Sequence, residues 1–134
     1  MSISTTQRLR IAERAGYRCE YCHLHQDHAA KRHEPDHIIP RKHGGGEGDD
    51  NLAWACFHCN RFKGSEVGAI DGETGQLVPL FNPRRQTWSD HFSLKDALIE
   101  PLTDVGRVTA LVLQLNRPAR VDARELLRQA GLYP

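Results

Sequence analysis

Two pairs of cysteines constrain this chain more than any other feature. Cys19 and Cys22 form one C-x2-C pair, Cys56 and Cys59 form a second, and no cysteine is left over. The two-residue spacing lets both sulfurs of a pair face one cation, and two such pairs supply the four thiolates that zinc accepts in tetrahedral geometry. We therefore predict a structural Zn²⁺ site that joins two distant segments. The alternatives are four thiols packed as small hydrophobic side chains and a redox-active cysteine pair.

Several histidines lie close to the cysteine pairs and offer another ligand set. A site with three cysteines and one histidine is conceivable, because zinc accepts imidazole as readily as thiolate. Four thiolates need no histidine, so we expect these residues to be solvated loop histidines. They are His23, His25, His28 and His58.

Length and charge limit what the chain can be. Its 134 residues are enough for one domain, and a hydrophobic content of 39% supports a core that a bound metal would reinforce. The net charge is only +1, so no global field favours a polyanion and any nucleic-acid surface must be local.

The compartment is predicted from the absence of targeting signals. The first sixteen residues hold no apolar run of signal-peptide length, and no later stretch is long and apolar enough to span a membrane. We therefore expect a cytoplasmic protein without membrane partners, in which thiols stay reduced.

A helix is predicted over residues 4–15, before the first cysteine pair. Thr5 or Thr6 is the expected N-cap, and Gly16 ends the helix. Leu9, Ala12 and Ala15 are expected along its buried face.

The region between the cysteine pairs reads as strand, long loop, strand and helix. The stretch DHIIP at 36–40 predicts a short strand, residues 41–50 a flexible turn, and NLAWACF at 51–57 a second strand. The helix that follows is expected to carry Asn60 as its N-cap or in its first turn.

These motifs together resemble the HNH endonuclease family, over about residues 10–66. The resemblance rests on the first C-x2-C, DHIIPRKHGG, NL and CFHCNRFKG. It implies a ββα-metal (His-Me finger) core with a four-cysteine zinc site. Many relatives carry histidine where this chain has Asn60, so the chain is an HNN variant.

The resemblance implies a role for each polar residue of the motif. His37 would be the general base, since an imidazole that titrates near neutrality suits proton removal from water. Asp36 and Asn60 would hold Mg²⁺ or Mn²⁺, which favour oxygen ligands. Asn51 would support the base through hydrogen bonds across the loop. A surface ion pair for Asp36 and an ordinary N-cap or turn role for the asparagines remain the alternatives.

Basic residues near these motifs are predicted phosphate contacts. Lys63 lies three residues after Asn60 and so on the same helix face, while Arg41 and Arg61 flank the motif. Arg84 and Arg85 occupy a predicted turn in the second half. Each has the alternative of an ordinary solvated cation.

The second half is predicted to be a β-hairpin followed by two helices. Residues 76–81 and 87–94 would be the strands, and Asp90 and His91 a hydrogen-bonding pair. One amphipathic helix is expected over 104–115, with Val105, Val108, Leu111, Val112 and Leu115 on one face, and another from Pro118 to Gly131. The fold class is α+β, as a single domain of residues 1–134: the HNH core at about 10–66 and an extension at about 67–134.

The functional hypothesis is a metal-dependent endonuclease acting on double-stranded DNA, as a monomer or a homodimer. The alternative is a noncatalytic zinc module that binds nucleic acid or protein. The Asp36–His37 pair and Asn60 favour the enzyme, because a bare zinc module needs none of them.

Overall fold

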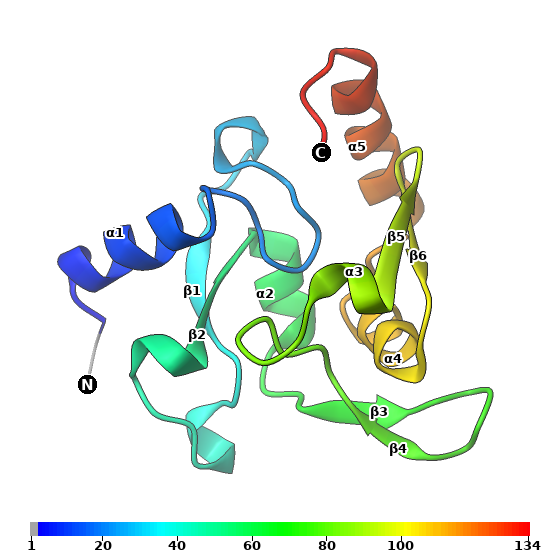
Figure 1. Ribbon diagram of the computed structural model, residues 1–134. Coiled ribbons are helices and arrows are strands. Elements are labelled where there is room, and N and C mark those ends of the chain that lie inside the picture. Colours follow the sequence, from blue (N-terminus) through cyan, green and yellow to red (C-terminus); the bar gives the residue numbers. More distant parts are fainter. Residues whose placement is uncertain (1–2) are drawn as a thin grey trace. The chain divides into compact units, whose positions relative to one another are not determined.

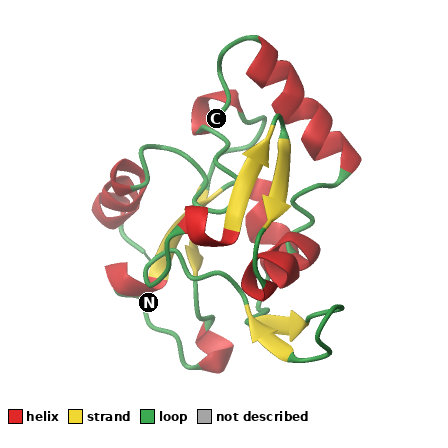
Figure 2. Cartoon of the chain, turned by 45° about the vertical axis from the view of Figure 1, so that its right-hand side comes forward, coloured by secondary structure: helices red, strands yellow, loops and turns green. Residues whose placement is uncertain are grey.

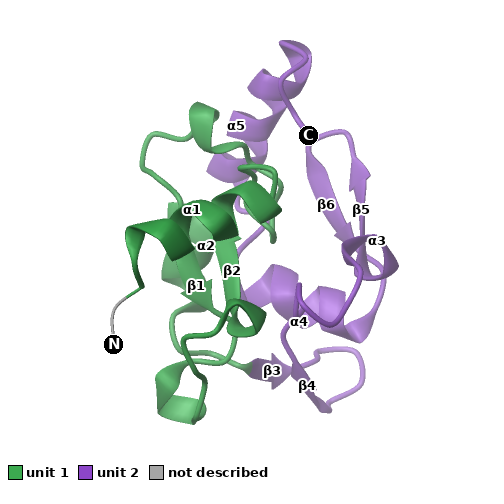
Figure 3. Ribbon diagram, turned by 60° about the vertical axis from the view of Figure 1, so that its left-hand side comes forward, with its two compact units in different colours: residues 1–67 green, residues 68–134 purple. Residues whose placement is uncertain are grey.

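The computed structural model describes residues 3–134 (Figure 1). The fold is mixed α+β, with helices α1–α5 and, among the described residues, three two-stranded antiparallel sheets (Figure 2). The chain divides into two compact units between Val67 and Gly68 (Figure 3). That boundary lies one residue beyond the predicted end of the HNH core, and the assignment of both halves to a single domain stays a prediction.

Helix α1 (Thr5–Arg14) packs against a strand of the first unit. Its N-cap is Ser4, whose hydroxyl accepts a hydrogen bond from the Gln7 amide at 3.1 Å, so the prediction of Thr5 or Thr6 as cap is wrong. The buried face consists of Ile11 and Ala12, which form a cluster with Leu52 and Trp54. Leu9, which we expected on that face, is 63% exposed.

The predicted order of strand, loop, strand and helix is confirmed. Strand β1 (Glu34–His37) pairs with β2 (Leu52–Ala55), so that Asp36 lies opposite Ala53 and His37 opposite Leu52. Every residue of β2 is buried. Helix α2 (Phe57–Lys63) follows directly (Figure 1).

The loop between β1 and β2 is more ordered than the glycine-rich sequence suggested. Two 3₁₀ turns, η2 (Arg41–His43) and η3 (Asp49–Asn51), lie within it, and a third, η1 (Gln26–His28), precedes β1. Gly45 approaches the backbone so closely that a Cβ there would lie 1.6 Å from the Ile39 carbonyl oxygen. Only glycine fits at this point of the loop.

The second unit contains two hairpins, so the prediction of one hairpin is wrong. Strand β3 (Gly68–Ile70) pairs with β4 (Leu77–Pro79), and β5 (Phe92–Lys95) pairs with β6 (Leu98–Pro101). The predicted second strand begins instead as helix α3 (Trp88–His91). The strand expected from residue 76 is β4, and it pairs with β3, which precedes it in the chain. The turn between them is closed by the Asp71 carboxylate, which accepts hydrogen bonds from the Glu73 amide and the Thr74 hydroxyl.

Helices α4 (Asp104–Val112) and α5 (Pro118–Gln129) complete the second unit. Helix α4 buries Val105 and Val108 as expected, but it ends before Leu115, and Leu111 is 66% exposed. Pro118 begins α5 as predicted. His91 contacts the Thr103 hydroxyl at 2.6 Å, whereas Asp90 is exposed, and no hydrogen bond joins the two within the described chain.

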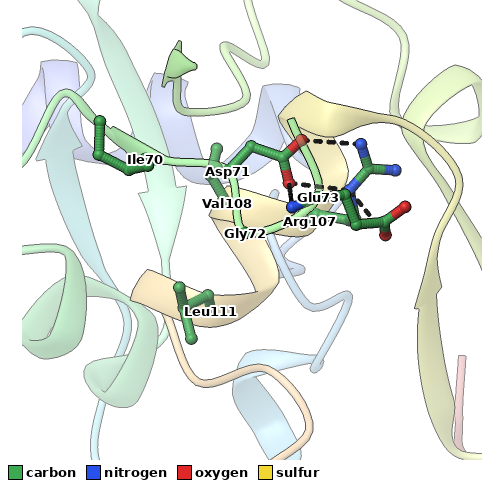
Figure 4. Close-up of a pocket in the computed structure, with 7 residues that line it drawn as sticks. All are labelled: Ile70, Asp71, Gly72, Glu73, Arg107, Val108 and Leu111. Carbon is green, nitrogen blue, oxygen red and sulfur yellow. Dashed lines mark hydrogen bonds and ion pairs between the residues drawn. The ribbon is translucent and has the colours of Figure 1, made fainter. Parts of the chain in front are cut away.

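An ion pair holds the β3–β4 turn on α4. Arg107 donates to both oxygens of Asp71 at 2.9 Å, beside an open pocket of about 230 Å³ that is also lined by Glu73 and by apolar side chains such as Val108 and Leu111 (Figure 4). The paired guanidinium holds the pKa of Asp71 well below its usual range. The pair therefore has a structural role within the second unit.

Across residues 3–134, no helix has both the length and the apolar character that crossing a membrane requires.

Candidate functional site

The two cysteine pairs meet in one buried cluster. The Sγ atoms of Cys19, Cys22, Cys56 and Cys59 all lie within 4.8 Å of one another. Those of Cys22 and Cys56 are 3.7 Å apart, close to the ~3.8 Å between thiolates that bind zinc tetrahedrally at ~2.3 Å. No histidine joins this cluster in the described part of the chain. The donor set therefore fits a structural Zn²⁺ site, and the alternative with a histidine ligand is not seen.

The local backbone explains why the sulfurs converge. The Cys19 sulfur accepts hydrogen bonds from the Tyr21 and Cys22 amides, and the Cys56 sulfur accepts one from the Cys59 amide. Cys56 is thereby the N-cap of α2, so the predicted cap role of Asn60 is wrong. Burial raises the pKa of the Cys19 and Cys59 thiols. A bound dication reverses that effect by binding the thiolates.

Asp36 lies in the interior between two donors. It is 3% exposed, and burial raises its pKa, although the Lys63 ammonium and a hydrogen bond from Tyr21 oppose the rise. The Tyr21 hydroxyl donates to Oδ2 at 2.7 Å, and the Lys63 ammonium donates to Oδ1 at 3.2 Å. Lys63 also donates to the His37 carbonyl at 2.8 Å. This ammonium therefore joins α2 to the end of β1.

His37 faces the other way and contacts a carboxylate that the motif analysis did not include. Its Nε2 lies 2.8 Å from the Glu47 Oε1, and the same oxygen accepts a hydrogen bond from Arg41 at 2.6 Å. Hydrogen bonds from Arg41 and His37 lower the pKa of Glu47 to about 2, so Glu47 is ionised at neutral pH. An ionised carboxylate only accepts hydrogen bonds. The proton of the neutral imidazole therefore lies on Nε2, and Nδ1 carries the lone pair.

Asn51 bridges the loop that carries Glu47. Its side-chain oxygen accepts from the Ile39 amide at 2.9 Å, and its side-chain nitrogen donates to the carbonyls of Ile39 and Gly46, also at 2.9 Å. These are hydrogen bonds across the loop of the kind that the resemblance implied.

Asn60 occupies the second turn of α2. Its half-buried carboxamide makes no hydrogen bond with any of residues 3–134. It lies three residues before Lys63, on the same helix face, and Lys63 contacts Asp36. Asp36 and Asn60 therefore lie on β1 and α2, two elements that the Lys63–Asp36 contact joins. The amide oxygen of Asn60 is available for a ligand.

The predicted phosphate contacts differ in their surroundings. Lys63 is not the surface cation that we expected, because it is 1% exposed and paired with Asp36. Arg41 is exposed but paired with Glu47, and Arg61 is exposed beside the Phe57 ring. In the second unit, Arg84 is half-buried and Arg85 is exposed, in the turn that follows Asn82.

Comparison with known proteins agrees with this geometry. Residues 19–66 match the family model described as HNH endonuclease, and this match suggests a nuclease-type function. No curated protein and no solved structure matched the chain.

Two residues of the site were missed by sequence analysis. Tyr21 lies inside the first cysteine pair, and nothing in its spacing indicates that its hydroxyl reaches Asp36. Glu47 follows three consecutive glycines, and only the folded loop brings it to His37. The only signal in the sequence was that Glu47 is an acidic residue in the polar loop between His37 and Asn51.

Proposed function

We propose that this protein is a metal-dependent endonuclease that hydrolyses phosphodiester bonds in double-stranded DNA, acting as a monomer or a homodimer. The observation that carries the proposal is the His37 imidazole. An ionised carboxylate holds it at the end of β1, next to Asp36 and within the segment that matches the HNH family. Cleavage would leave 5′-phosphate and 3′-hydroxyl ends.

His37 is the general base in this proposal. Its Nδ1 lone pair accepts a proton from the attacking water, which makes the water nucleophilic toward phosphorus. The imidazolium that forms is stabilised by the Glu47 carboxylate on the opposite nitrogen. Glu47 is thus a positioning residue, comparable to the carboxylate that orients histidine in a catalytic triad. Asn51 supports the same loop from its other side.

Asp36 and Asn60 would hold Mg²⁺ or Mn²⁺. A carboxylate offers about four lone-pair sites, and hydrogen bonds from Tyr21 and Lys63 occupy only two of those on Asp36. Asn60 contributes a neutral oxygen and leaves room for the phosphate charge. When bound, the ion stabilises negative charge on the leaving oxygen. Arg41, Arg61, Arg84 and Arg85 remain predicted phosphate contacts, whereas Lys63 instead fixes Asp36.

The metal requirement tests this proposal. We expect the purified protein to nick supercoiled plasmid with Mg²⁺ or Mn²⁺ and not with EDTA, with zinc content checked after incubation. Asn60→Ala should raise the metal concentration needed for half-maximal rate at least about tenfold, because even residues behind the ligands affect metal affinity that much. Asn60→Asp, which keeps an oxygen donor, should restore the requirement toward that of wild type.

Cleavage in EDTA, or identical metal curves for Asn60→Ala and wild type, would contradict the assignment. If zinc-loaded wild-type protein cut no plasmid with either metal, the noncatalytic zinc module would become the better description.

Glu47 gives a second expected result. Glu47→Ala should lower the turnover number about tenfold to a hundredfold, the range found for residues that orient catalytic ligands, with little change in KM. In ¹⁵N NMR spectra at fixed pH, His37 should lose its uniform Nε2–H form. Glu66→Ala is the matched control, because Glu66 is an exposed glutamate of the same unit. An unchanged His37 tautomer in Glu47→Ala would show that Glu47 does not position the base.

A further inference from the structure

Most cations of the first unit are paired. Among the ten Lys and Arg residues between positions 3 and 67, seven donate to a carboxylate or a backbone carbonyl: Arg8, Arg10, Arg14, Arg18, Arg32, Arg41 and Lys63. Lys31, Lys42 and Arg61 have neither kind of partner in the described chain, and all three are exposed. No acidic side chain among the described residues pairs with any of these three cations, although exposed carboxylates such as those of Asp50 and Glu66 also lie in this unit.

Two of these three cations converge on one aromatic ring. The Lys31 ammonium lies 4.6 Å from the centre of the Phe57 ring, and the Arg61 guanidinium carbon lies 5.8 Å from it. Lys31 comes from the segment before β1, whereas Phe57 and Arg61 lie one turn apart on α2. The fold therefore brings to one aromatic ring two like charges that are 30 residues apart in the sequence.

The placement of Lys31 and Arg61 at one ring favours the binding of an anion beside Phe57. Like charges repel when they are close, and a surface with interspersed acids avoids such a pairing. Each cation lies within cation–π distance of the half-buried Phe57 ring. This contact restricts two flexible side chains, which lowers the entropy lost when they bind a partner. An anionic partner with more than one charge would relieve the repulsion and contact both groups.

We propose that Lys31, Phe57 and Arg61 form a contact surface for the phosphodiester backbone of the DNA substrate. The surface adjoins the catalytic residues in sequence, since Arg61 follows Asn60 directly. Phosphate contacts of this kind fix the register of a bound strand without reading its bases. The inference rests on the proposed function only in naming DNA as the substrate, because it requires binding and not cleavage.

The salt dependence of binding tests this surface. A His37→Ala parent, free of divalent ions in the assay, would be titrated against a fluorescent duplex of about two helical turns at several salt concentrations. Adding Lys31→Ala and Arg61→Ala should weaken binding about tenfold to a hundredfold near 0.1 M salt and reduce the slope of log K against log salt by about 1.8, which corresponds to two lost phosphate contacts. Phe57→Leu should weaken binding less and keep the slope.

Arg32→Ala is the matched control for Lys31→Ala. Arg32 is the next residue and is also exposed, but it is paired with Glu34 at 2.9 Å, so its removal should leave the slope nearly unchanged. Zinc content would confirm that each variant is folded. If the double variant kept the parent's slope and affinity, the surface assignment would be overturned while cleavage by wild type still supported the nuclease. If neither wild type nor parent bound duplex and wild type did not nick, both proposals would fall.

Discussion

Replacing His37 by alanine is expected to slow plasmid nicking by about 10²–10⁴-fold, the usual contribution of a positioned general base. The rate should fall because the proton of the attacking water has no comparable acceptor once the imidazole is gone. His37 is partly exposed and its ring is oriented by Glu47, so removing it should leave the fold intact. Initial rates with Mg²⁺ and with Mn²⁺, compared at equal zinc content, measure the effect.

His43→Ala provides the control for that experiment. His43 lies in the η2 turn of the same loop and is exposed, so its loss should change the rate little. A His37→Ala protein that cut as fast as wild type would remove the central residue of the proposed mechanism. A large loss in His43→Ala alone would transfer the role of base to that histidine.

Removal of zinc is expected to unfold the first unit. Structural zinc contributes about 10–16 kcal/mol of apparent binding free energy in small zinc-dependent folds, more than most domains have as total stability. The cluster joins the segment before β1 to the start of α2, and that segment also supplies Gln26, which accepts a hydrogen bond from the Trp54 indole at 2.9 Å. Losing the metal should therefore expose Trp54 and abolish nicking.

Tryptophan fluorescence measures this directly in a Trp88→Phe background, where Trp54 is the only tryptophan. Chelation or Cys56→Ser should shift the emission to longer wavelength, and returning zinc should reverse the shift for the chelated protein but not for Cys56→Ser. Unchanged emission after measured loss of zinc would show that the four cysteines do not maintain this unit.

The segment that matches the HNH family shows where sequence patterns predict well. Cysteine spacing is a local covalent constraint, and it predicted the four-sulfur cluster that the fold forms. The order of strands and helix around the cluster was also predicted, because turn residues and apolar runs bound each element. Asn51 makes the cross-loop hydrogen bonds that the resemblance implied. The catalytic roles of Asp36, His37, Asn51 and Asn60 stay predictions.

Contacts between distant residues were not predictable in the same way. Lys63 was expected on the surface, but the buried carboxylate of Asp36 pairs with its ammonium and offsets part of the cost of removing that charge from water. In the second unit, the strand near residue 77 paired with β3 and not with the segment after residue 86. Local β propensity does not specify which strand is the partner, because packing against the rest of the unit decides it.

The sequence by itself therefore determined the four-cysteine cluster and the order of elements in the first unit, since each depends on spacing along the chain. Only the tertiary structure decided that Glu47 orients His37, that Lys63 pairs with Asp36, and that Lys31 meets Arg61 at Phe57. These side chains are separated by 10, 27 and 30 residues. Their proximity depends on loop closure and burial, which no local pattern of amino acids encodes.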